Sequence, residues 1–203
     1  TRCTGMKAII LAAGIASRLR PLTDNCPKCL LEIGGKCLLQ RSFDGLIKNG
    51  INDFIVVTGY LHEQIETFLN ERYSGVNITF IHNEVYSSTN NIYSLWLARK
   101  EAEGKDILLL DSDILFDPQI VERLLKSEHG DILALNNHPL GEEEIKIIPD
   151  TDGRVAEISK TCSIADAIGE SIGIERMSAS YTTALYKELE VMIEQEGLDN
   201  VFY

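Results

Sequence analysis

Short runs of consecutive apolar residues alternate along this chain with segments whose apolar residues recur at every third or fourth position. A short apolar run is typical of a strand buried on both faces of a sheet, and the wider spacing is typical of a helix with one buried side. The expected strands are residues 7–11, 54–57, 78–81, 107–110 and 132–135. Strands that alternate with helices in this way predict an α/β fold, with a mostly parallel sheet and helices on both faces.

Local sequence signals indicate where some of the expected helices begin and end. Asn49-Gly50 follows a helical stripe and is a good C-terminal signal, and Asp117-Pro118 combines a capping carboxylate with a proline suited to the first turn. Further along, two short alternating segments, 144–148 and 154–158, are joined by turn residues, which predicts an antiparallel hairpin. We therefore expect a Rossmann-like sheet with an antiparallel hairpin added in its second half, followed by a helix that Ser178 caps.

The length and charge of the chain limit its partners. We expect residues 6–203 of the 203-residue chain to form one domain, with residues 1–5 as a tag remnant or upstream tail. The net charge of −12 argues against nucleic acid and anionic membranes as partners. No run approaches the roughly 20 apolar residues that span a bilayer. The five cysteines are an odd and modest number, which favours reduced thiols and a cytoplasmic protein.

The segment that follows the first strand carries the strongest functional signal. It reads L-A-A-G-I-A-S-R-L-R-P-L-T from Leu11 to Thr23, and P-K-C-L-L follows from Pro27. Small residues at the end of a strand let backbone N–H groups approach phosphate oxygens, and Arg18 and Lys28 add positive charge. The alternative from composition alone is a tight strand-to-helix turn with solvated basic residues.

This segment resembles the signature of nucleotidyltransferases that activate sugars and alcohols. The G-x-G-x-x-G pattern of dinucleotide-binding folds is absent. The family's second glycine is Ala16 here, and a family proline is Cys37. The resemblance implies a GT-A-like fold in which Lys28 and Arg18 are catalytic. It also implies that the nucleotide is wrapped by Leu11, Ala12, Ala13, Gly14, Ile15 and Ala16.

Two carboxylates follow the apolar strand 107–110, in the sequence Asp111-Ser112-Asp113. Alternate side chains at a strand end share a face, and hard oxygen ligands suit Mg²⁺. A charged strand end without function is the alternative. By the resemblance, Asp113 is the primary metal ligand and Asp111 a supporting one. Family members commonly carry a further acidic ligand on a late strand, which has no clear match here, so we expect the chain to lack the last elements of its catalytic domain.

The stretch after the third strand is expected to read the base. Its run N-N-I-Y-S-L is most similar to small cytidylyltransferases that act on phosphocholine and 2-aminoethylphosphonate, which implies CTP as the donor. Asn83 and Thr89 are candidates for the base, since amides offer both donor and acceptor. We place Asn90 with the substrate-binding residues, although one of Asn90 and Asn91 is expected to cap a helix.

By the resemblance, the acceptor site includes Lys160, Glu170 and Ser171, with a solvated surface role as the alternative for each charged residue. Between Asn136 and Met177 there is no Phe, Tyr or Trp for a trimethylammonium cage, but there are nine carboxylates, Glu170 among them. We therefore favour 2-aminoethylphosphonate over phosphocholine, followed by a sugar 1-phosphate. A glycosyltransferase and a non-catalytic nucleotide sensor are the rival functions. A fused or associated enzyme domain is a further expectation, and the oligomeric state stays open.

Overall fold

The predicted alternation of strands and helices is present in the computed structural model, which describes residues 5–201. The strands of the main sheet are β1 (Lys7–Ala12), β4 (Asp53–Thr58), β5 (Asn77–His82), β6 (Ile107–Asp111), β7 (Ile132–Asn136), β8 (Lys146–Pro149), β9 (Val155–Ser159) and β10 (Gly169–Met177). The helices are α1 (Leu38–Lys48), α2 (His62–Arg72), α3 (Asn91–Leu97), α4 (Arg99–Ala102), α5 (Pro118–Lys126) and α6 (Ala179–Glu190), which continues into a π-helical turn, Val191–Gln195. The expectation about residues 1–5 falls almost entirely outside the described residues.

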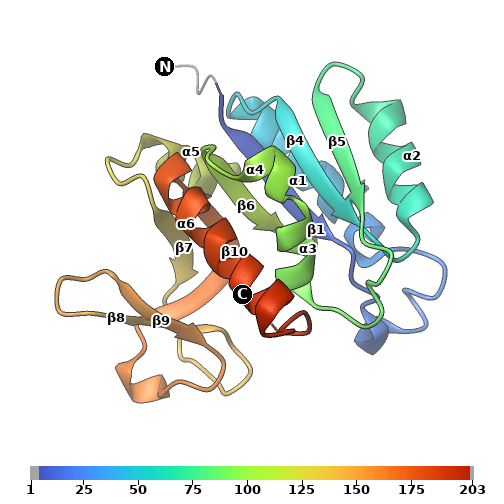
Figure 1. The fold of residues 1–203 in the computed structure, drawn as a ribbon. Helices are drawn as coiled ribbons and strands as arrows, with labels where there is room; N and C mark the ends of the chain where they lie inside the picture. Colours follow the sequence, from blue (N-terminus) through green and yellow to red (C-terminus); the bar gives the residue numbers. More distant parts are fainter. Residues whose placement is uncertain (1–4, 202–203) are drawn as a thin grey trace.

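The sheet is parallel in its first half and antiparallel in its second. Its order is β5-β4-β1-β6-β10-β8-β9, and β7 pairs with β10. Strands β1, β4, β5 and β6 run parallel, whereas β10 is antiparallel to β6, β7 and β8. The α/β fold and the added hairpin β8–β9 are therefore confirmed (Figure 1).

Strand β10 joins the two halves of the sheet. Its C-terminal part pairs with β6 and β7, and its N-terminal part pairs with β7 and β8. The pairing with β7 shifts between Ser171 and Glu175, and Gly173 within this irregularity has a φ of 72°. A left-handed residue of this kind favours glycine and lets the strand bend.

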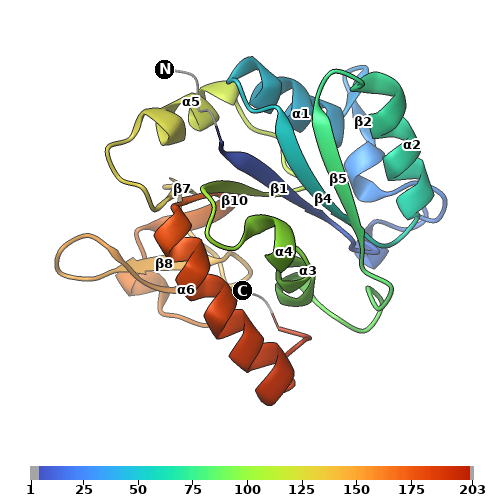
Figure 2. The same cartoon turned by 45° about the horizontal axis from the view of Figure 1, so that its top comes forward.

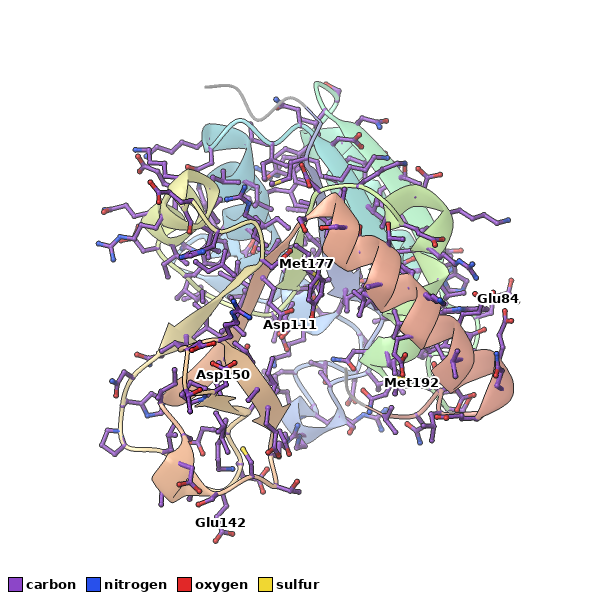
Figure 3. The ribbon with its side chains drawn as sticks, turned by 60° about the vertical axis from the view of Figure 1, so that its left-hand side comes forward. Glu84, Asp111, Glu142, Asp150, Met177 and Met192 are labelled. Carbon is purple, nitrogen blue, oxygen red and sulfur yellow. The ribbon has the colours of Figure 1, made fainter. Side chains whose placement is uncertain are left out.

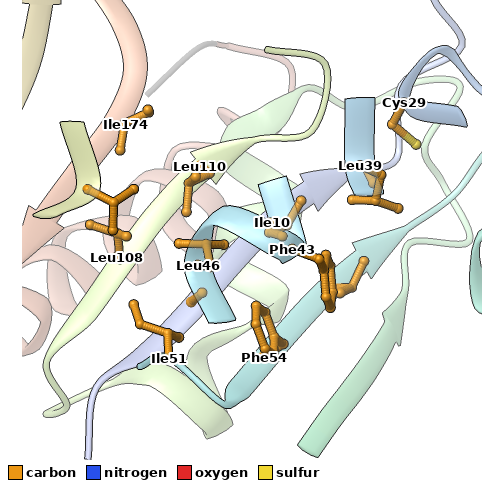
Figure 4. Close-up of a cluster of buried hydrophobic side chains, with 14 of the residues drawn as sticks. Ile10, Cys29, Leu39, Phe43, Leu46, Ile51, Phe54, Leu108, Leu110 and Ile174 are labelled. Carbon is orange, nitrogen blue, oxygen red and sulfur yellow. The ribbon is translucent and has the colours of Figure 1, made fainter. Parts of the chain in front are cut away.

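Helices cover both faces of the sheet, as expected. On one face α1, α2 and α5 pack over a core that includes Ile10, Phe43 and Phe54, with the two phenylalanine rings stacked at 4.3 Å (Figure 4). On the other face α3, α4 and α6 cover Ile9 and Leu109, and α6 lies beside α3 (Figures 1 and 2). The strands β1, β4 and β6 are buried from both sides, which explains their continuous apolar sequences.

The helix-end signals act as predicted. The Asp117 carboxylate accepts a hydrogen bond from the Gln119 N–H at 2.9 Å, and the Ser178 hydroxyl caps α6. A small hairpin formed by β2 (Glu32–Ile33) and β3 (Lys36–Cys37) precedes α1 and was not expected from the sequence. Among residues 5–201 no helix is long and apolar enough to cross a bilayer, and the four described cysteines are unpaired thiols.

Candidate active site

A cleft of 690 Å³ opens where the parallel strands β1 and β6 end. This is the edge at which open α/β sheets bind ligands. Of the residues predicted from the sequence, those that line this cleft are Leu11, Ala12, Ala13, Gly14, Ala16, Arg18, Lys28, Asn83, Thr89, Asn90, Asp111 and Asp113. The predicted residues that do not line it are Ile15, Lys160, Glu170 and Ser171. The structure therefore gathers three segments that are far apart in the sequence.

The loop after β1 is accessible at Gly14 and held in place at Ala16. A Cβ atom at Gly14 would meet no atom within 4 Å, so the backbone there is accessible to a ligand. Ala16 has a φ of 51° and a ψ of 45°, the left-handed conformation that glycine adopts most easily. Its carbonyl accepts a hydrogen bond from the Thr23 hydroxyl at 3.0 Å. Ala16 therefore adopts a left-handed conformation, which suits the glycine found at this position in the family signature. For alanine this conformation costs free energy.

Lys28 and Asp113 form an ion pair across the cleft. Lys28 lies on a 3₁₀ turn, η2 (Lys28–Leu30), whose buried Cys29 anchors it to the core. The Lys28 ammonium nitrogen is 2.5 Å from a carboxylate oxygen of Asp113, and each side chain is about one-third exposed, at 36% and 34%. The pair places a cation and an anion in the same cleft as the loop after β1.

Asp111 occupies the last position of β6 (Figure 3). Burial raises the pKa of the Asp111 carboxyl to about 6, the nearby Asp113 charge adds to the increase, and Lys28 opposes it. Gly173 of β10 lies against this carboxylate, because a Cβ atom there would be 3.0 Å from the Asp111 Cγ. Two carboxylates that repel each other at one strand end form a donor set that fits a divalent cation.

The donor set is incomplete when taken from the protein alone. No group of three or more His, Cys, Asp or Glu side chains suited to a metal occurs among residues 5–201. Magnesium usually takes only one or two carboxylates and completes its shell with water and substrate phosphates. Asp111 and Asp113 are therefore sufficient protein ligands only for a metal that is shared with a bound nucleotide.

Asn83 holds in place the loop after β5, which forms the wall of the cleft opposite the loop after β1. Its side chain is buried, its amide nitrogen donates to the hydroxyls of Thr89 and Ser94 at 3.1 Å each, and its amide oxygen accepts from the Val85 N–H. Direct recognition of a base by this amide would require breaking these contacts. Asn90 is the helix cap, since its side chain accepts from the Asn91 N–H at 2.9 Å.

The family model described as Nucleotidyl transferase matches residues 7–135, which is more than half of the chain. The chain belongs to the nucleotidyl transferase family. The match ends within β7, so it covers the loop after β1, Lys28 and both aspartates. The hairpin β8–β9 and strand β10 lie beyond it.

Several relatives of this nucleotidyl transferase are named as cytidylyltransferases. It is 44% identical over 53% of its length to choline-phosphate cytidylyltransferase of Streptococcus pneumoniae, but the match spans only 45% of that relative. It is 33% identical over 97% of its length to 2-aminoethylphosphonate cytidylyltransferase of Lancefieldella rimae, of which it covers 76%. A solved CTP:phosphocholine cytidylyltransferase from Streptococcus pneumoniae superimposes with a TM-score of 0.75 and 28% identity, covering 97% of this chain and 81% of that one.

The predicted acceptor residues of the nucleotidyl transferase lie in the antiparallel half of the sheet, with Glu170 and Ser171 on β10 and Lys160 directly after β9. Glu170 accepts from His138 Nε2 at 2.9 Å, and this contact with the carboxylate is the main reason that the pKa of His138 is raised. Lys160 lies 3.9 Å from Glu143, and the Ser171 hydroxyl accepts from a backbone N–H. The expectation that Glu170 meets an acceptor ammonium therefore stays a prediction, in which the ammonium replaces the His138 side chain.

Two features of this region were not expected from the sequence. Tyr86 lines the cleft but belongs to no recognised motif. Its place in the loop after β5 was the one signal that could have predicted a position in the site. Lys146 is fully buried, and its ammonium donates to the backbone carbonyls of Glu142, Glu144 and Lys160. Lys146 therefore has a structural role that holds the hairpin closed.

Proposed function

We propose that this chain transfers a cytidylyl group from CTP to a small phosphonate or phosphate acceptor and releases pyrophosphate. One observation carries the proposal: the loop after β1, the Lys28–Asp113 pair and Asp111 meet in one cleft. The cytidylyltransferase names of the relatives support CTP as the donor.

Lys28 and Arg18 have separate electrostatic roles in this proposal. The acceptor oxygen is already anionic at neutral pH, so catalysis depends on positioning and charge neutralisation. Lys28, fixed by the buried Cys29, faces the α-phosphate, where negative charge increases in the transition state. Arg18 is exposed at the rim of the cleft and neutralises the departing pyrophosphate.

Asp113 and Asp111 are the proposed protein ligands for Mg²⁺. When bound, Mg²⁺ would supply positive charge that neutralises the phosphates. The close approach of Gly173 fixes the Asp111 carboxylate at the strand end. Asp113 would then hold the metal in place of its ion pair with Lys28, and the Lys28 ammonium would be available to the phosphates.

The favoured acceptor is 2-aminoethylphosphonate. A primary ammonium needs hydrogen-bond acceptors, and a trimethylammonium needs aromatic faces. The segment after Asn136 offers carboxylates, Glu170 among them, and no Phe, Tyr or Trp before Met177. The relative named for 2-aminoethylphosphonate also matches 97% of the chain.

A competition assay tests the acceptor. The enzyme would receive CTP, Mg²⁺ and equal amounts of 2-aminoethylphosphonate and phosphocholine, with products quantified by mass spectrometry. We expect the phosphonate product to dominate, and to decrease selectively when Glu170 is changed to Gln. A preference for phosphocholine would contradict the ordering, and a preference for a hexose 1-phosphate would contradict the acceptor class.

A further inference from the structure

The turn between β4 and α2 is wedged between the two loops that form the cleft walls. A Cβ atom at Gly59 would lie 2.7 Å from the Ala13 carbonyl oxygen and 2.7 Å from the Tyr86 Cβ. No side chain fits at this distance, so the turn makes backbone contact with both loops. The next residue but one, Leu61, has a φ of 50°, which is costly for a bulky residue. The surrounding contacts must hold this turn in place.

Tyr60 connects this turn to both ends of the loop that runs from Ala13 to Asp24. Its backbone N–H donates to the Ala13 carbonyl at 3.1 Å, where the loop begins. Its hydroxyl donates to the carbonyls of Thr23 and Asp24, at 2.9 and 2.8 Å, where the loop ends. One residue therefore fixes the beginning and the end of a loop whose middle carries Arg18.

Two further contacts extend this arrangement. The hydroxyl of the buried Thr23 donates to the Ala16 carbonyl, so the end of the loop also holds its middle in place. The Tyr60 ring also lies 6.3 Å from the ring of Tyr86 on the opposite wall. The turn thus touches both walls of the cleft without lining it.

We infer that Tyr60 is a positioning residue for nucleotide binding, acting through the loop from Ala13 to Asp24. Its hydroxyl fixes the end of the loop, so that the backbone N–H groups near Gly14 and the Arg18 guanidinium are preorganised for a triphosphate. The inference rests on the proposed function for its kinetic consequence. Its structural consequence, a restrained loop, is independent of which nucleotide binds.

The test compares Tyr60→Phe with Tyr73→Phe. Tyr73 is a matched control, because its hydroxyl also makes two hydrogen bonds, to the Gln40 carbonyl at 3.2 Å and to Asp44 at 2.9 Å, and it lies at the other end of α2. Each substitution removes one hydroxyl and keeps the ring. Thr23→Val is a second variant that loosens the same loop by removing the contact with Ala16.

We expect Tyr60→Phe to raise KM for CTP about tenfold, equivalent to about 1.4 kcal/mol, with kcat changed by less than about threefold. Amide hydrogen exchange in residues 14–25 should accelerate about tenfold in Tyr60→Phe and Thr23→Val. Tyr73→Phe should change neither quantity.

Equal effects of Tyr60→Phe and Tyr73→Phe on KM and exchange, or no effect of either, would overturn the inference. The same holds if Tyr60→Phe lowers kcat alone. If the wild-type chain releases no pyrophosphate from CTP with any acceptor, the proposed function fails, and the exchange comparison still decides whether Tyr60 restrains the loop.

Discussion

Lys28 and Asp113 are 85 residues apart in the sequence, yet the lysine ammonium and the aspartate carboxylate lie 2.5 Å apart. Each belongs to a segment that the strand ends bring to one edge of the sheet. In the proposed function Lys28 meets a phosphate and Asp113 holds the metal, and in this structure their two charges neutralise each other. This arrangement predicts different results for the removal of either partner.

Asp113→Asn removes the charge of the proposed primary metal ligand and keeps the shape of the side chain. We expect kcat to fall on the order of 100-fold or more, a loss of about 2.7 kcal/mol or more of transition-state stabilisation. The circular dichroism spectrum should be unchanged. A rate close to the wild-type value at saturating Mg²⁺ would show that Asp113 does not hold the metal.

Lys28→Ala should lower kcat more than it raises KM for the triphosphate, because the charge that Lys28 meets increases in the transition state. Lys36→Ala is a suitable control, since Lys36 also pairs with an aspartate, Asp44 at 2.7 Å, but is exposed and away from the cleft. Steady-state kinetics of the two variants makes the comparison. A change in KM alone for Lys28→Ala would assign it to binding only.

Ala16→Gly should stabilise the protein, because glycine adopts the observed left-handed conformation without the strain of a Cβ atom. We expect a gain of about 0.5–1 kcal/mol in the free energy of unfolding, measured with urea. The reverse is expected for Ala184→Gly, an exposed position inside α6, which should lose about 1 kcal/mol. A loss at both positions would show that Ala16 is unstrained.

Glu175 gives a pH-dependent prediction. Burial, with the nearby Asp111 charge, raises the pKa of its carboxyl to about 7. The folded protein therefore holds this proton more tightly than the unfolded chain does, and the associated stability is lost as the pH rises through about 7. From about pH 5 to 8, the wild type should lose about 1–3 kcal/mol of unfolding free energy relative to Glu175→Gln.

Urea unfolding without Mg²⁺ at several pH values measures this difference. Glu188→Gln serves as the control, because Glu188 is an exposed glutamate on α6. Its curve should run parallel to that of the wild type. Parallel curves for Glu175→Gln as well would mean that the Glu175 carboxyl titrates normally.

The parts of the fold that could be predicted are those with a local cause. Strands β1, β4 and β6 are buried on both faces, so each is a continuous apolar run. Strand β10 is harder to recognise, because Glu175 and Arg176 interrupt its apolar pattern and Gly173 bends it. Its place between β6 and β7 depends on tertiary pairing, which no local pattern contains.

The candidate site divides in the same way. The loop residues and the aspartates follow strands and fit a signature, so their meeting could be predicted. The contacts of Tyr60 could not, because a hydroxyl that donates to backbone carbonyls leaves no pattern in the sequence. Nor could the pairing of Glu170 with His138, which joins β10 to the loop after β7.

The central claim is tested most directly by measuring pyrophosphate release with each of CTP, UTP, ATP and GTP, in Mg²⁺ and 2-aminoethylphosphonate, for the wild type and Asp113→Asn. We predict release with CTP well above the other triphosphates, dependence on both acceptor and metal, and loss in the variant. Release that is equal with all four triphosphates, or that persists in Asp113→Asn, would contradict the account.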